Sequence, residues 1–140
     1  MPMGPAPFGF AYFSAVKFAG YTAAALYFKD SYQRPDLSIW KVGAARTALG
    51  IAAGVSYGAA WFLVGKFVNV DNFGPWPFLG FLLPIRISEW LLILWLFFER
   101  NRTPTGRLVK RALLGTGWSY VLDAIGIVAA WVIPGGIWVC

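Results

Sequence analysis

Four charged side chains interrupt stretches of the sequence that are otherwise apolar. They are Lys17, Arg86, Glu89 and Asp123, and each lies near the middle of a hydrophobic run. A lone charge in the middle of a bilayer costs about 2.5–3.5 kcal/mol, even on the scales derived from insertion experiments. Because two bases and two acids cancel in charge, we expect the four side chains to meet in one polar cluster.

Ionisable residues inside a membrane indicate a functional site by default. A cluster of this composition suits a proton or ion relay, or a polar pocket for a lipid headgroup. Glu89 and Asp123 could also share a proton, as in aspartyl proteolysis, but nearby bases would keep both carboxylates ionised. The competing interpretation is a salt-bridge network that only fixes helix order and register, and the charge balance favours it.

Two residue types that many enzymes and metal sites use, histidine and cysteine, are absent or nearly absent from the sequence. It contains no histidine, which excludes a Ser-His-Asp triad, a His-ligated zinc site and a His-ligated haem. Cys140 is the single cysteine, so the chain has no internal disulfide and no CxxC pair. We therefore predict no catalytic residue, no metal site and no cofactor.

The elements that must position the cluster are four apolar runs. Hydrophobic residues make up 59% of the chain and charged residues 13%, about half the charge of an ordinary soluble domain. The runs cover residues 8–28, 42–65, 77–98 and 112–133, each close to the ~20 residues that cross a bilayer as a helix. The predicted fold is all-α: one integral membrane domain, 1–140, forming a bundle of four transmembrane helices.

The distribution of the basic residues predicts the orientation of this bundle. Two connecting segments, after the first and third runs, share eight of them: Lys29, Arg34, Lys41, Arg100, Arg102, Arg107, Lys110 and Arg111. The segment after the second run has only Lys66. By the positive-inside rule the two basic segments are cytoplasmic and both termini lie outside, in a bacterial inner membrane or a plasma membrane.

Two further features concern helix packing and lipid contact. Gly50, Gly54 and Gly58 recur every four residues and predict a ridge on which another helix packs closely, either within the chain or in a homodimer. Arg46 and Arg111 stand near the predicted cytoplasmic helix ends, where they could contact lipid headgroups.

The second and fourth runs begin with similar sequences, and the first and third runs end with similar sequences. Residues 46–50 read RTALG and residues 111–115 read RALLG. This similarity predicts a duplicated two-helix hairpin whose copies are related by an axis along the membrane normal. The alternative is that apolar helices of similar composition resemble one another without duplication.

Three functions are compatible with this sequence. The first is a non-catalytic integral membrane protein, a subunit or an assembly component of a membrane complex. The second is a small homo-oligomeric transporter or channel that uses the charge cluster, and the third is a membrane-embedded lipid-modifying enzyme. The expected partners are the lipid bilayer and either a second copy or a partner in a membrane complex. The net charge of +6 does not indicate nucleic acid, because the basic residues flank apolar runs and do not form a stripe.

Overall fold

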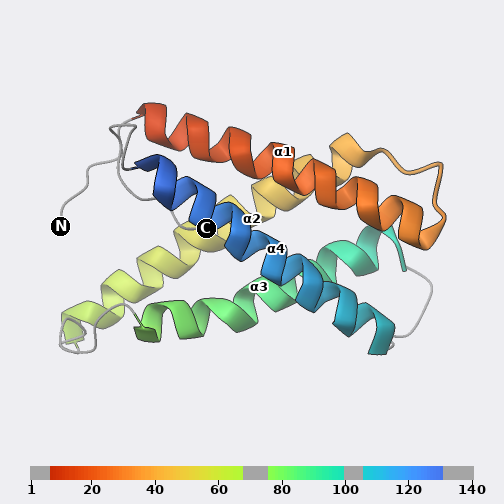
Figure 1. Ribbon diagram of the computed structural model, residues 1–140. Helices are drawn as coiled ribbons and strands as arrows, with labels where there is room; N and C mark the ends of the chain where they lie inside the picture. The colour runs from red at the N-terminus through yellow and green to blue at the C-terminus, as the bar shows by residue number, and fades with distance from the viewer. Residues whose placement is uncertain (1–6, 68–75, 100–105, 131–140) are drawn as a thin grey trace.

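The computed structural model describes residues 7–67, 76–99 and 106–130, which form four α-helices and, within these ranges, no strand (Figure 1). The helices are α1 (Pro7–Tyr32), α2 (Ile39–Phe67), α3 (Trp76–Phe97) and α4 (Gly106–Ala130). The predicted all-α class with four helices is confirmed for the described part of the chain.

The helices pack mainly against their neighbours in sequence. α1 lies chiefly on α2 and α3 chiefly on α4, and contacts between α2 and α3 and between α1 and α4 close the bundle. Figure 1 shows α2 crossing the bundle diagonally, so that its C-terminal part lies beside the start of α3 and away from α1. The duplication of the two hairpins stays a prediction.

Two helix starts differ from the predicted bounds. α4 begins at Gly106, not at 112, so Arg107, Lys110 and Arg111 lie on its first two turns and not in a loop. α2 begins at Ile39, not at 42, which moves every residue of that helix about one turn further from its N-terminus. Apolar runs alone missed these starts because both helices begin with residues that are not uniformly hydrophobic.

The turn between α1 and α2 is a helix C-cap built on a residue other than glycine. Gln33 has a positive φ of 53°, its N–H donates to the Asp30 carbonyl at 3.1 Å, and the Arg34 N–H donates to the Lys29 carbonyl at 3.1 Å. These two bonds are those of a Schellman motif, which satisfies carbonyls that the helix end leaves open. The motif directs the chain back so that α2 runs antiparallel to α1.

The core is centred on Trp90 of α3. Its indole is 1% exposed and packs against the rings of Tyr21 (centroids 5.8 Å apart) and Phe28 (5.6 Å) of α1. On its other side lies Gly115 of α4, where an added Cβ would be 2.4 Å from the indole. The absence of a side chain at Gly115 therefore lets α4 approach the largest side chain of the core.

Two of the four helices are long and apolar enough to cross a membrane: Ile39–Phe67, and the stretch Gly80–Phe97 of α3. α1 does not meet that standard, since it is rich in Ala, Gly and Tyr, and α4 carries charges in its first turns and at Asp123. Part of the predicted fourth run, 131–133, lies outside the described residues. Four spanning helices thus stay a prediction.

Candidate functional site

Five buried charged side chains from all four helices form a group that we call the central network: Lys17, Arg46, Arg86, Glu89 and Asp123. Each is at most 7% exposed. Four of them are the residues singled out from the sequence, and Arg46 is an addition.

Asp123 of α4 joins three helices. One carboxylate oxygen pairs with the Lys17 ammonium of α1, and the other lies 2.5 Å from Arg86 Nη2 of α3. The Lys17 ammonium also donates to the Tyr21 hydroxyl at 3.4 Å and to the Ser119 carbonyl at 3.5 Å. One carboxylate therefore serves two cations, an arrangement that fixes the relative positions of α1, α3 and α4.

Arg46 and Glu89 form the second part of the network and link α2 to α3. Arg46 Nη2 lies 2.7 Å from Glu89 Oε2, and the guanidinium carbon lies 4.7 Å from the Tyr21 ring centre and 5.1 Å from that of Trp90. The headgroup contact predicted for Arg46 does not fit this position, since the side chain is 0% exposed. The prediction failed because Arg46 lies on the face of α2 that is turned into the bundle, whereas Ala44 and Ala48, on the other face at nearly the same depth, are exposed.

Arg86 and Glu89 are three residues apart on α3, a spacing at which two side chains are neighbours on one helix face. The structure instead pairs Arg86 with Asp123 and Glu89 with Arg46, so each carboxylate has a cation from another helix. A proton shared between Glu89 and Asp123 does not fit this arrangement, since the ion pairs of Asp123 are with Lys17 and Arg86 and that of Glu89 is with Arg46.

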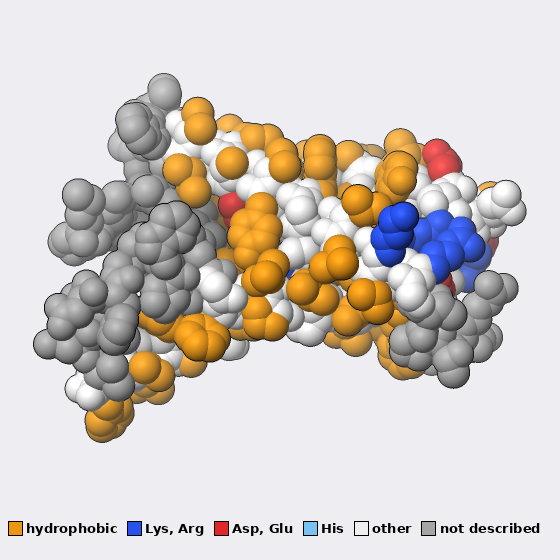
Figure 2. Space-filling model, turned by 60° about the horizontal axis from the view of Figure 1, so that its bottom comes forward, with side chains coloured by type: hydrophobic (Ala, Val, Ile, Leu, Met, Phe, Trp, Pro, Cys, Tyr) orange, Lys and Arg blue, Asp and Glu red, His pale blue; other side chains and the backbone are white. Residues whose placement is uncertain are grey.

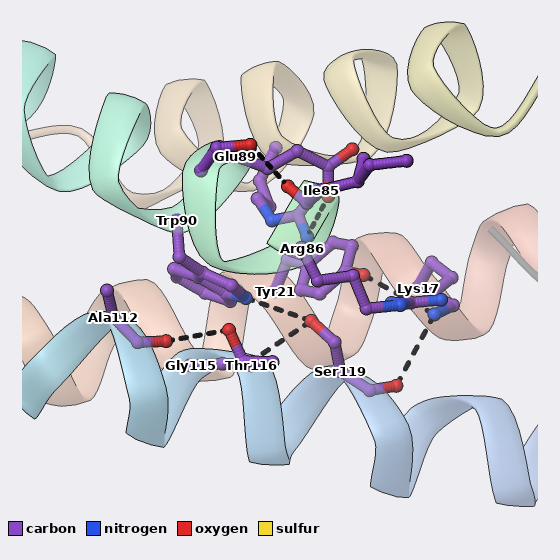
Figure 3. A network of polar contacts seen from close by, with 12 residues as sticks. Lys17, Tyr21, Ile85, Arg86, Glu89, Trp90, Ala112, Gly115, Thr116 and Ser119 are labelled. Atoms are coloured by element: carbon purple, nitrogen blue, oxygen red, sulfur yellow. Dashed lines mark hydrogen bonds and ion pairs between the residues drawn. The ribbon is translucent and has the colours of Figure 1, made fainter. Parts of the chain in front are cut away.

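Hydroxyl and indole groups of α3 and α4 complete the polar centre (Figure 3). The Trp90 indole N–H donates to Ser119 Oγ at 2.9 Å, and the Ser119 hydroxyl donates to the Gly115 carbonyl at 3.1 Å. Figure 3 shows Arg86 reaching from α3 toward Lys17 of α1. Nothing in the sequence indicated the role of Trp90.

A second polar group lies at the end of the bundle where α1 ends and α4 begins; we call Ser31, Tyr32, Arg107 and Arg111 the cap. Arg111 Nη2 donates to the carbonyl of Ser31 at 3.0 Å and to its hydroxyl at 2.5 Å, and Arg107 Nη2 donates to the same carbonyl at 3.2 Å. The Arg111 guanidinium carbon lies 3.7 Å from the centre of the Tyr32 ring. The predicted headgroup residue Arg111 is thus half-buried and held by α1.

The pKa of the Tyr32 hydroxyl depends on its burial, on the positive Arg111 and on the negative Glu99. Burial raises its pKa above the ordinary value, while Arg111 lowers it and the buried Glu99 raises it. The net direction is upward, so Tyr32 stays protonated to a higher pH than an exposed tyrosine.

The predicted glycine ridge runs from the interior of the bundle to its surface. Gly50 is buried, and an added Cβ would lie 3.1 Å from Arg46 Nη1 of the same helix. Gly54 is half-buried, and Gly58 is exposed with no atom within 4 Å of an added Cβ. At Gly58 no described helix packs against the ridge, so its partner stays a prediction.

Comparison with known proteins adds no functional assignment. No protein-family model matches the sequence, and no curated protein and no solved structure is significantly similar to it. Within 7–67, 76–99 and 106–130 no group of three acidic, His or Cys side chains is arranged to hold a metal ion.

Proposed function

We propose that the chain is an integral membrane protein with four spans. The observation that carries this proposal is an arrangement opposite to that of a soluble protein, with charges inside and large apolar side chains outside. The central network is buried, whereas every helix exposes large hydrophobic residues, among them Leu26, Val55, Phe81 and Val128. Figure 2 shows hydrophobic side chains over most of one face, with Lys and Arg gathered at one end. Bilayer is the solvent in which such a surface is stable.

The orientation follows from the basic end of the bundle. Lys29, Lys41, Arg107, Lys110 and Arg111 all lie in the last turn of α1 or the first turns of α2 and α4. Under the positive-inside rule this end is cytoplasmic, in a bacterial inner membrane or a plasma membrane, with the termini outside.

Within that membrane we assign the chain a non-catalytic role, as a subunit or assembly component of a membrane complex. Three ion pairs link all four helices and engage both carboxylates of the central network, which suits a structural lock better than acid–base chemistry. The C-terminal half of α2 is largely exposed and carries small residues such as Gly58. Small residues let a partner helix approach closely in a membrane, where packing drives association.

A cysteine cross-link tests this role. In a Cys140→Ser background, Gly58→Cys should form one adduct of constant mass with a partner membrane protein in native membranes, and Gly54→Leu should abolish it. Ser56→Cys is the matched control, because Ser56 is exposed at the same depth on the opposite side of α2. A dimer of this chain would favour a homo-oligomer instead, and equal adducts from both cysteines, or none, would contradict the role.

One observation favours the transporter as a second candidate. The central network contains three cations and two carboxylates, an excess of one positive charge within these five residues. The Nε and Nη1 groups of Arg46 and Arg86 have no hydrogen-bond partner among the described residues. A small cavity of about 10 Å³ is lined in part by Lys17 and Ser14, and its volume is close to the space that one water-sized occupant needs.

This second candidate implies a small anion as the transported species. Purified protein in vesicles should then carry halide current that Lys17→Gln reduces and Lys66→Gln leaves unchanged. The apolar side chains of Phe28, Leu94 and Phe98 fill the core between the network and the cap, which is why we place transport second. Absence of any halide flux from active, correctly folded protein would remove this candidate.

A further inference from the structure

A groove of about 340 Å³ lies between α1 and α4, over residues 23–28 and 114–118. It is lined by side chains of α1 and α4 that are mostly apolar: Ala23, Ala24, Tyr27, Leu114, Gly115 and Trp118. The groove exists because Ala23, Ala24 and Gly115 are small, and Gly115 must be small to accommodate Trp90.

Both ends of the groove are closed by bonds between the two helices. At the end farther from the cap, the Trp118 indole N–H donates to the Gly20 carbonyl at 2.9 Å. At the other end, Arg111 is bonded to Ser31. Between these two contacts the groove is open to the surface of the bundle and is lined mainly by apolar side chains.

The arginines of the cap lie on α4 one and two helical turns before Gly115, beyond the end of the groove that is nearer the cap. Arg111 precedes Gly115 by four residues, and Arg107 precedes Arg111 by four, so the three share one face of α4. Ser31 likewise follows Tyr27 by four residues on α1. Arg107 is exposed, and Arg111 Nη1 is buried without a hydrogen-bond partner in the described part of the chain. The buried Glu99 also acts on Tyr32, so two arginines and one carboxylate lie near the mouth of the apolar groove, with a net positive charge.

We propose that this groove binds one anionic phospholipid, with its phosphate on Arg107 and Arg111 and an acyl chain along Ala23, Ala24 and Leu114. The charge complementarity selects the occupant, because a partner helix would place apolar side chains against the arginine pair. The proposal depends on the membrane placement above and is independent of the accessory role. Lipid headgroups of the cytoplasmic leaflet are anionic and are attracted to such basic clusters.

Titration of the delipidated full-length protein in neutral detergent, followed by native mass spectrometry, tests the proposal. Phosphatidylglycerol should bind more tightly than phosphatidylcholine with the same acyl chains. Each of Arg107→Ala and Arg111→Ala should weaken phosphatidylglycerol binding about fivefold and leave phosphatidylcholine unchanged. Lys41→Ala is the charge control, because Lys41 is exposed at the same end but lies on α2. It should change neither affinity.

A second pair of variants tests the groove itself. Ala23→Leu fills the groove without changing charge and should weaken the binding of both lipids, whereas Ala124→Leu, on an exposed site of α4, should not. Arg107→Ala and Ala23→Leu change surface residues, so they remain informative if Arg111→Ala does not fold. Glycerol phosphate, which has no acyl chain, should not displace the lipid.

Three results would overturn the proposal: equal affinity of the Arg107→Ala variant and the unsubstituted protein for phosphatidylglycerol, an equal loss in Lys41→Ala, or unchanged binding in Ala23→Leu. Displacement by glycerol phosphate would reduce the site to a phosphate site and would likewise contradict it. None of these results affects the cross-link at Gly58, so a failure of the lipid-site proposal can be distinguished from a failure of the proposed accessory role.

Discussion

The central network and the cap both hold arginines that are joined to neighbouring helices, but in different ways. Arg46, 0% exposed, has a carboxylate at 2.7 Å and aromatic rings on its faces. Arg111, half-buried, has a carbonyl, a hydroxyl and the Tyr32 ring. Burial thus determines the kind of partner, since a fully buried cation needs a countercharge and a half-buried one does not.

The largest effect should come from removing a buried countercharge. Asp123→Asn leaves Lys17 and Arg86 without their shared carboxylate, and we expect it to lower the free energy of unfolding by about 3–5 kcal/mol. Denaturant titration in detergent, followed by helical circular dichroism, measures this loss. Asp36→Asn is the matched control, because it breaks only the exposed pair with Arg34 and should leave the unfolding midpoint unchanged. An equal loss in the two variants would contradict the difference between buried and exposed pairs.

A smaller effect should follow from filling the space beside Trp90. Gly115→Ala forces a Cβ against the indole, and we expect a loss of about 1–3 kcal/mol from overpacking. Gly58→Ala adds the same methyl group in open space and should be neutral or stabilising by up to about 1 kcal/mol. Denaturant titration in detergent measures the change in the free energy of unfolding for both variants. Destabilisation by Gly58→Ala in membranes but not in dispersed monomers would indicate that a helix packs there.

The smallest effect concerns pH at the cap. Because the folded state raises the pKa of Tyr32, it holds the phenol proton more tightly than the unfolded chain does. This contribution is fully present below the unfolded pKa of about 10 and is lost as pH rises through the folded value. Denaturant titration at pH 9 and at pH 11 should therefore show a larger fall in the free energy of unfolding for the unsubstituted protein than for the Tyr32→Phe variant. Parallel losses in the two proteins would show that Tyr32 is not responsible.

The helices could be predicted because apolar runs of about the length of a span are a direct signal. Lys17, Arg86, Glu89 and Asp123 could be selected because charge is rare within such runs. Their pairing could not be predicted, since spacing within one helix says nothing of the neighbouring helix. Arg86 and Glu89, three apart in sequence, have partners on two other helices.

Arg46 was misplaced for a different physical reason. The residues around it are apolar on every side of α2, so hydropathy does not show which face of the helix is turned into the bundle. The glycines that flank Arg46, Gly43 and Gly50, were a signal that this part of α2 is closely packed. At Gly43 an added Cβ would lie 2.3 Å from the Thr22 hydroxyl of α1. The groove between α1 and α4 had no signal of its own, because it depends on which helices are adjacent.

The pairing of charges across helices is tested most directly by two double-mutant cycles on the stability of the detergent-solubilised protein. One combines Arg46→Gln with Glu89→Gln, and the other combines Arg86→Gln with Glu89→Gln. We predict a coupling energy of about 1–3 kcal/mol between Arg46 and Glu89, and a coupling within about 0.5 kcal/mol of zero between Arg86 and Glu89. A larger coupling between Arg86 and Glu89 than between Arg46 and Glu89 would contradict the account.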